Sequence, residues 1–117
     1  MNPDKGRPAT VELGEANFDA EVLQWKQPVL VLFWAPWSRP CLILRPLLEA
    51  VAEECRGRAK VVELNVDDYP ALGSWYAIES IPTLLFFMDG AVRARIVGTA
   101  SKTAIYSKLK ACVSEAG

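Results

Sequence analysis

The stretch PVLVLFWAPWSRPC, residues 28–41, decides the fold of this chain. Its first half, from Pro28 to Trp34, is a continuous apolar run with β-branched and aromatic residues, which predicts a strand covered on both faces. A Pro-Trp-Ser turn follows, and apolar residues then recur at helical spacing from Arg39 to Cys55. The stretch therefore predicts a buried strand that leads through a tight turn into a long helix.

The turn has the frame of a dithiol redox loop in which oxygen replaces the first sulfur. Two cysteines spaced C-x-x-C beside a strand–helix junction are typical of disulfide exchange, whereas this chain has Ser38 and Cys41 at those two positions. A hydroxyl cannot form a disulfide, and the chain has no histidine that could activate it as a nucleophile. Serine is among the best helix N-caps, worth about 1 kcal/mol, so we expect capping to be the role of Ser38.

The composition is that of a soluble globular domain. Apolar residues make up 51% and charged residues 23% of the 117 residues, which is ordinary for one such domain. With 13 basic and 14 acidic residues the net charge is −1, which gives no electrostatic reason to bind nucleic acid or an anionic membrane. The longest apolar run, residues 28–37, is too short to cross a bilayer.

The N-terminal residues differ in character from the rest of the chain. Residues 1–9 are polar, rich in proline and basic residues, and contain no apolar segment of a secretory signal. We therefore expect a flexible arm over residues 1–9, a single domain over residues 10–117, and a cytoplasmic location.

The cysteines do not form a disulfide framework, because Cys41, Cys55 and Cys112 are odd in number and widely spaced. Cys55 and Cys112 are expected to be small apolar fillers or incidental surface thiols. The absence of histidine excludes histidine metal sites, and the sequence predicts neither a metal nor another cofactor.

Strand and helix patterns alternate along the remaining chain. Further strands are predicted at residues 10–13, 60–66, 83–88 and 92–97, and further helices at residues 16–24, 70–76 and 101–113. Pro46 is expected to kink the long helix, and Asp89-Gly90 predicts a tight hairpin. The order β-α-β-α-β-α-β-β-α predicts an α/β fold with a mixed five-stranded sheet and helices on both faces.

These motifs occur in the order in which one known family carries them, and the chain resembles thioredoxin over about residues 10–114. The matching segments are Phe33-Trp34-Ala35-x-Trp37, Pro40-Cys41, Pro46, Leu64-Asn65-Val66-Asp67, Ile81-Pro82-Thr83, Gly90, Val97-Gly98 and Ser101-Lys102. The resemblance implies the thioredoxin fold and a protein thiol–disulfide oxidoreductase.

Three positions depart from the family's pattern. Ser38 replaces the nucleophilic cysteine, and Arg39 replaces the usual glycine and adds positive charge. Leu32 occupies the place where the family usually keeps a buried aspartate, thought to assist proton transfer at the second cysteine. The resemblance makes Cys41 the shielded resolving thiol. Without a partner sulfur at position 38 we expect it to be a buried, slow thiol, with a glutathionylated monothiol as the alternative.

The resemblance also implies a shallow substrate groove beside the turn. A cis Pro82 would expose the backbone of Ile81 to pair with an extended peptide. Trp37 is expected to be exposed, whereas Trp34 either packs in the core or contributes to the groove. The residues implied to line the groove are Trp34, Trp37, Arg39, Pro40, Ile81, Pro82, Val97 and Gly98.

The residues and the resemblance leave three functions open. The first is an atypical thioredoxin, reduced by a thioredoxin reductase and acting on protein disulfides, in which serine was substituted for cysteine at position 38, so that the chain as given is inactive in dithiol exchange. The second is a naturally redox-inactive module that binds extended peptides or acts like a chaperone, which the loss of the aspartate at Leu32 favours. The third is a monothiol redox sensor that uses Cys41, Cys55 or Cys112.

Overall fold

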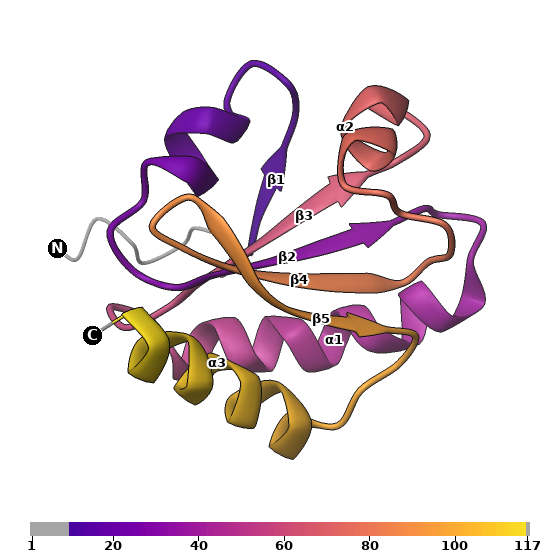
Figure 1. Cartoon of the computed structure of the whole chain (residues 1–117). Coiled ribbons are helices and arrows are strands. Elements are labelled where there is room, and N and C mark those ends of the chain that lie inside the picture. Colours follow the sequence, from indigo (N-terminus) through magenta and orange to yellow (C-terminus); the bar gives the residue numbers. More distant parts are fainter. Residues whose placement is uncertain (1–9, 117) are drawn as a thin grey trace, which may run out of the picture.

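The structure, a computed structural model, describes residues 10–116 of the chain. Within them five strands form one mixed sheet in the order β1-β3-β2-β4-β5 (Figure 1). The strands are β1 (Thr10–Leu13), β2 (Val29–Trp34), β3 (Lys60–Asn65), β4 (Thr83–Met88) and β5 (Ala91–Val97). β1, β3 and β2 are parallel, and β4 and β5 continue the sheet in antiparallel pairing. The predicted α/β fold with a mixed five-stranded sheet is confirmed.

Helices cover both faces of this sheet (Figure 1). α1 (Arg39–Glu54) and α3 (Lys102–Ala116) lie on one face, and α2 (Pro70–Trp75) lies on the other with η1 (Asp19–Leu23), a single π-helical turn. The helix predicted at residues 16–24 is therefore shorter than expected and has a wider turn. α1 continues through Pro46 without ending there.

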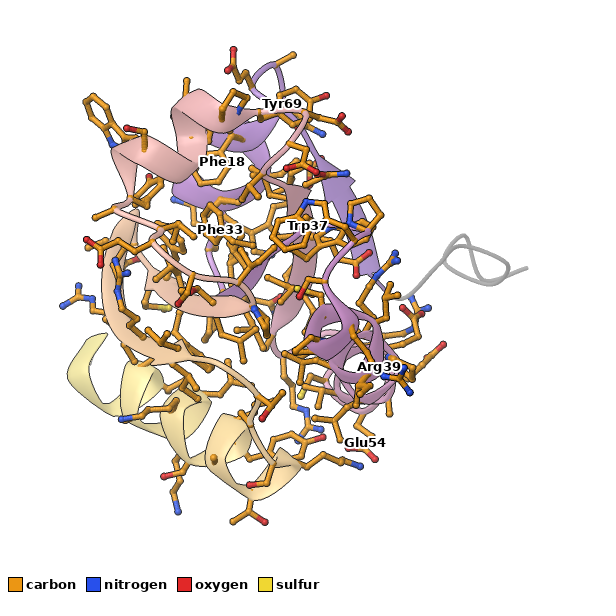
Figure 2. All side chains as sticks on the ribbon, turned by 90° about the vertical axis from the view of Figure 1, so that its right-hand side faces the viewer. Phe18, Phe33, Trp37, Arg39, Glu54 and Tyr69 are labelled. Carbon is orange, nitrogen blue, oxygen red and sulfur yellow. The ribbon has the colours of Figure 1, made fainter. Side chains whose placement is uncertain are left out.

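β2 is the centre of the core and is buried along its whole length, as the continuous apolar run predicts. Because successive side chains of a strand point to opposite faces, β2 supplies both core layers. The residues facing α1 and α3 are Leu30, Leu32 and Trp34, and those facing η1 and α2 are Val29, Val31 and Phe33. The side chains that fill both layers are drawn in Figure 2.

A two-residue turn joins β4 to β5. Met88 and Ala91 are register partners, and both turn residues have positive φ, 53° at Asp89 and 79° at Gly90. Two consecutive positive φ angles match the right-handed twist of the flanking strands, which is why Asp-Gly is favoured in such turns. The predicted hairpin is confirmed.

Residues 1–9, for which a flexible arm was predicted, lie outside the described residues, as does residue 117. In the part of the chain that the structure describes, no helix combines the length and the apolar character needed to cross a membrane.

Candidate functional site

The turn between β2 and α1 holds Ser38 in a fixed position. The Ser38 amide donates to the Ala35 carbonyl at 3.1 Å, and the Ser38 carbonyl accepts from the Leu42 amide at 3.2 Å. Ser38 has extended backbone angles (φ −91°, ψ 111°), and its Oγ accepts from the Cys41 amide at 3.5 Å. This is the geometry of an N-cap, which satisfies one of the free amides of the first helical turn. The predicted capping role of Ser38 is confirmed.

Both positions of the S-x-x-C motif are withdrawn from solvent. Ser38 is 5% exposed, and Cys41 is fully buried within the layer between the sheet and the helices α1 and α3. A thiol with no exposed surface reacts slowly with reagents in solution, because the thiolate must be both formed and reached. The arrangement therefore matches a shielded thiol better than an accessible redox sensor.

The other two cysteines are also buried, and neither forms a disulfide. Cys55 follows the end of α1, Cys112 lies on α3, and both belong to the same core layer as Cys41. Of the two predicted alternatives, their burial supports small apolar fillers and contradicts surface thiols. No exposed cysteine is found among residues 10–116.

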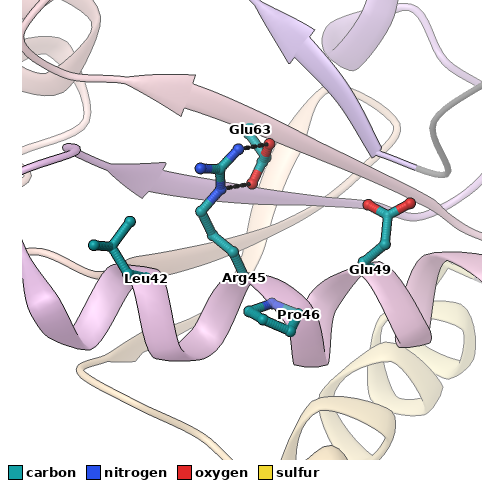
Figure 3. Close-up of a pocket in the computed structure, with 5 residues that line it drawn as sticks. All are labelled: Leu42, Arg45, Pro46, Glu49 and Glu63. Carbon is teal, nitrogen blue, oxygen red and sulfur yellow. Dashed lines mark hydrogen bonds and ion pairs between the residues drawn. The ribbon is translucent and has the colours of Figure 1, made fainter.

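Leu32 is fully buried, and the residue beside it on the neighbouring strand is a glutamate. Leu32 and Glu63 are register partners in the parallel pair β2–β3. Glu63 is only 7% exposed, and its carboxylate accepts two hydrogen bonds from the Arg45 guanidinium, at 2.7 Å from Nε and 3.1 Å from Nη2 (Figure 3). A carboxylate buried beside position 32 is therefore present, but it lies on β3 and a cation neutralises it.

Arg45 connects this ion pair to the strand that leads into the turn. Its guanidinium carbon lies 3.9 Å from the centroid of the Trp34 ring, within the range of a cation–π contact. Trp34 is 8% exposed, and its Nε1 has no hydrogen-bond partner among the described residues. Of the two roles considered for Trp34, the structure supports packing.

Sequence analysis did not identify the Arg45–Glu63 pair. The available signal was a charge inside each of two apolar patterns, Glu63 in the third strand and Arg45 within the long helix. Their partnership joins residues 18 positions apart and depends on how α1 lies against β3.

A hollow of about 400 Å³ opens beside Trp37, which is 71% exposed as predicted. The Trp37 Nε1 donates to Oδ2 of Asp67 at 2.9 Å, and Figure 2 shows Trp37 on the face turned to the viewer, below Tyr69 and above Arg39. The residues that line the hollow are Trp37, Val66, Pro70, Gly73, Ser74, Ile78, Glu79, Ser80 and Ile81. The lining thus comes from Trp37 in the turn before α1, from Val66 after β3, from α2 and from the loop before β4.

The structure brings some of the implied groove residues together around this hollow and leaves others outside. Trp37 and Ile81 line it, and the Ile81–Pro82 peptide bond is cis. The Gly98 amide donates to the Pro82 carbonyl at 2.8 Å, which places exposed Val97 next to the same loop. Gly98 has a φ of 93°, a conformation that residues with a side chain rarely adopt.

The remaining implied groove residues lie elsewhere. Arg39 and Pro40 are exposed at the start of α1 but do not line the hollow, and Trp34 is buried in the core. Among the described residues no group of three or more histidine, cysteine or acidic side chains could hold a metal ion.

Two side chains with shifted pKa values, Glu54 and Tyr106, lie near the opposite end of α1 from Ser38. Hydrogen bonds from Lys102 and Tyr106 hold the pKa of the Glu54 carboxyl below its ordinary value, and the same carboxylate raises the pKa of Tyr106. These groups join α1 to α3 and are part of the scaffold.

Comparison with known proteins identifies the family of this chain. A protein-family model described as Thioredoxin matches residues 9–111. The thioredoxin of Synechocystis sp. is 41% identical over 102 residues, which cover 87% of this chain and 95% of that protein. The thioredoxin of Porphyra purpurea is 40% identical over 103 residues, covering 88% and 96%. A bifunctional thioredoxin reductase/thioredoxin of Mycobacterium leprae is 39% identical over 109 residues, covering 93% of this chain and 24% of that protein. The family match, the identity of about 40% to thioredoxins over most of their length, and the fold together show that this chain belongs to the thioredoxin family.

Proposed function

We propose that this chain is the scaffold of a protein thiol–disulfide oxidoreductase whose nucleophile position is held by Ser38, so that as given it does not catalyse dithiol exchange. The observation that carries the proposal is the Ser38 Oγ at the N-cap of α1, three residues before the buried Cys41. An oxygen at that place caps the helix but cannot form the mixed disulfide on which the reaction depends.

With cysteine at position 38 the exchange would proceed in two steps. The thiolate at position 38 attacks one sulfur of a substrate disulfide, which forms a mixed disulfide and releases the other sulfur as a thiolate. The Cys41 thiolate then attacks the sulfur at position 38, releases the second substrate thiolate and leaves a disulfide between positions 38 and 41. The positive end of the α1 dipole would stabilise the attacking thiolate at position 38.

Recycling requires a donor of two electrons. We assign this role to a thioredoxin reductase, because the Mycobacterium leprae relative joins a thioredoxin reductase and a thioredoxin in one protein. Protein disulfides are the substrates, and we assign their contacts to exposed Trp37, the Ile81–Pro82 loop and the Val97–Gly98 segment that is hydrogen-bonded to it.

Reduction of insulin with dithiothreitol as electron source tests this function. The given chain is compared with Ser38→Cys and with Ser38→Ala, which removes the hydroxyl without adding sulfur. We expect turnover from Ser38→Cys only, and we expect it to be lost when Cys41→Ser is added to that variant. Turnover by the given chain above the Ser38→Ala background would contradict the proposed role of Ser38.

A naturally redox-inactive peptide-binding module is the second candidate. The observation that favours it is Leu32, because a substitution at position 38 alone does not account for the missing aspartate on β2. Inert Ser38→Cys together with measurable peptide binding at the hollow beside Trp37 would select this candidate over the first.

A further inference from the structure

The hollow beside Trp37 combines apolar walls with charge of one sign. Trp37, Ile78 and Ile81 provide apolar surface, and Glu79 is the charged residue among those that line the hollow. Glu79 is exposed, so its carboxylate can meet a ligand without first being desolvated. The site is thus shaped for an apolar group with a polar or charged neighbour.

The chain around the hollow extends this negative character. Residues 66–81, which supply most of the lining, contain three acidic residues, Asp67, Asp68 and Glu79, and no lysine or arginine. Asp67 and Asp68 are exposed next to the lining residue Val66. A cleft that carries one sign of charge raises the local concentration of ligands of the opposite sign.

Two arginines lie near the residues of the hollow, but neither lines it. Arg95 is turned to the end of α2, where its guanidinium donates to the carbonyls of Tyr76 at 2.8 Å and Ala77 at 3.4 Å. Arg39 is exposed at the start of α1 and is not part of the lining. The Arg95 guanidinium is thus bonded to backbone carbonyls just before Ile78, and Glu79 is the charged residue of the lining itself.

The indole of Trp37 is both exposed and anchored by a hydrogen bond. Its Nε1 is bound to Asp67 at 2.9 Å, which fixes the ring while leaving 71% of the residue exposed. The face of an indole attracts ammonium and guanidinium groups as well as apolar side chains. A wall that is already ordered loses little conformational entropy when a ligand binds.

We propose that the hollow selects extended polypeptide segments that carry a lysine or arginine beside an apolar residue. The apolar side chain packs against Trp37, Ile78 and Ile81, and the cation pairs with Glu79. This inference rests on the proposed function, because it names the class of polypeptide that the same surface accepts.

The test uses the given chain, whose Ser38 prevents covalent capture, and short peptides without cysteine. Three capped peptides are identical except for one position next to a leucine, which is lysine, glutamine or glutamate. Binding is followed at low ionic strength by amide and indole chemical shifts of the isotope-labelled chain. We expect the affinity order lysine, glutamine, glutamate, with about a two- to five-fold preference for lysine over glutamine, since exposed ion pairs are weak. Added salt should remove most of this preference.

Two variants assign the preference to this surface. Glu79→Gln should remove most of the advantage of the lysine peptide over the glutamine peptide, and the part that remains is the contribution of Asp67 and Asp68. Glu53→Gln is the matched control, because Glu53 is an exposed glutamate near the end of α1 that pairs with Arg56 and is not part of the hollow, and it should leave the order intact.

Equal affinity for the three peptides, or a lysine preference that is undiminished in Glu79→Gln, would overturn the inference. Shifts confined to a surface away from the Trp37 indole would do the same. The insulin assay with Ser38→Cys is independent of these results, so an active variant without a charge preference refutes the peptide class alone.

Discussion

Replacing Leu32 with aspartate would return a carboxylate to β2, and we expect it to destabilise this chain severely. Leu32 is fully buried, so losing its side chain costs about 2–5 kcal/mol before any charge is considered. Its register partner Glu63 lies on the adjacent strand, about 5 Å away as strands are spaced. At an effective dielectric constant of about 20, two like charges at that distance repel by about 3 kcal/mol.

The charge contribution can be separated from the packing loss with a second variant. Leu32→Asn has nearly the same shape as Leu32→Asp but carries no charge, so their difference isolates the effect of the carboxylate. Because Arg45 already neutralises part of the Glu63 charge, we expect Leu32→Asp to be about 2 kcal/mol less stable than Leu32→Asn at neutral pH. Urea unfolding followed by tryptophan fluorescence measures both free energies.

The pH dependence gives an independent check. Burial beside Glu63 should raise the folded-state pKa of the introduced carboxyl above its unfolded value of about 3.9. The folded state then binds the proton more tightly, so the deficit of Leu32→Asp is largest above the folded-state pKa and shrinks as the pH falls toward the unfolded value. Equal stability of the two variants at neutral pH would refute the argument that Glu63 acts on position 32.

Two further predictions concern the ends of α1. Ser38→Ala should lower the free energy of unfolding by about 0.5–1 kcal/mol through loss of the N-cap, and Ser38→Asn should retain most of it in the same urea assay; no loss in the alanine variant would show that the 3.5 Å contact contributes nothing. Lys102→Met should raise the pKa of the Glu54 carboxyl toward its ordinary value, measured by carbon-detected NMR titration, because Lys102 is the main cause of its lowering. The pKa of Glu54 is lower in the folded state than in the unfolded state. The interactions of its carboxylate therefore stabilise the fold fully above the unfolded-state pKa, and this stabilisation is lost as the pH falls through the folded-state pKa. An unchanged titration in Lys102→Met would assign the lowering to Tyr106.

Local sequence patterns were sufficient to predict the strand β2, the β4–β5 hairpin and the N-cap of α1. The apolar run from Pro28 to Trp34 predicted a strand buried on both faces, and β2 is such a strand. Asp89-Gly90 predicted the hairpin because its turn requires two positive φ angles, and Ser38 predicted an N-cap because a short hydroxyl side chain reaches the first free amides. Each of these preferences acts between residues only a few positions apart.

Local sequence patterns did not predict the type of helix at η1. The spacing of Phe18, Val22 and Leu23 predicted an ordinary helix over residues 16–24, whereas the structure has one π-helical turn from Asp19 to Leu23. The apolar contacts of this segment, Phe18 and Val22 in the layer with β2 and β4, are those that a helix would also make. Periodicity therefore identified the buried face but not the width of the turn.

The sequence by itself determined the order of strands and helices, the burial of β2 and the S-x-x-C junction, because these depend on residue type and short spacing. Only the tertiary structure decided that Glu63 lies beside Leu32 and is neutralised by Arg45, and that Asp67 anchors Trp37 across 30 positions of the chain. Only the structure placed Glu79 on the wall of the hollow that Trp37 opens. The physical reason is that strand register and the docking of α1 and α2 on the sheet bring distant polar groups within hydrogen-bonding range, and no local preference encodes which groups will meet.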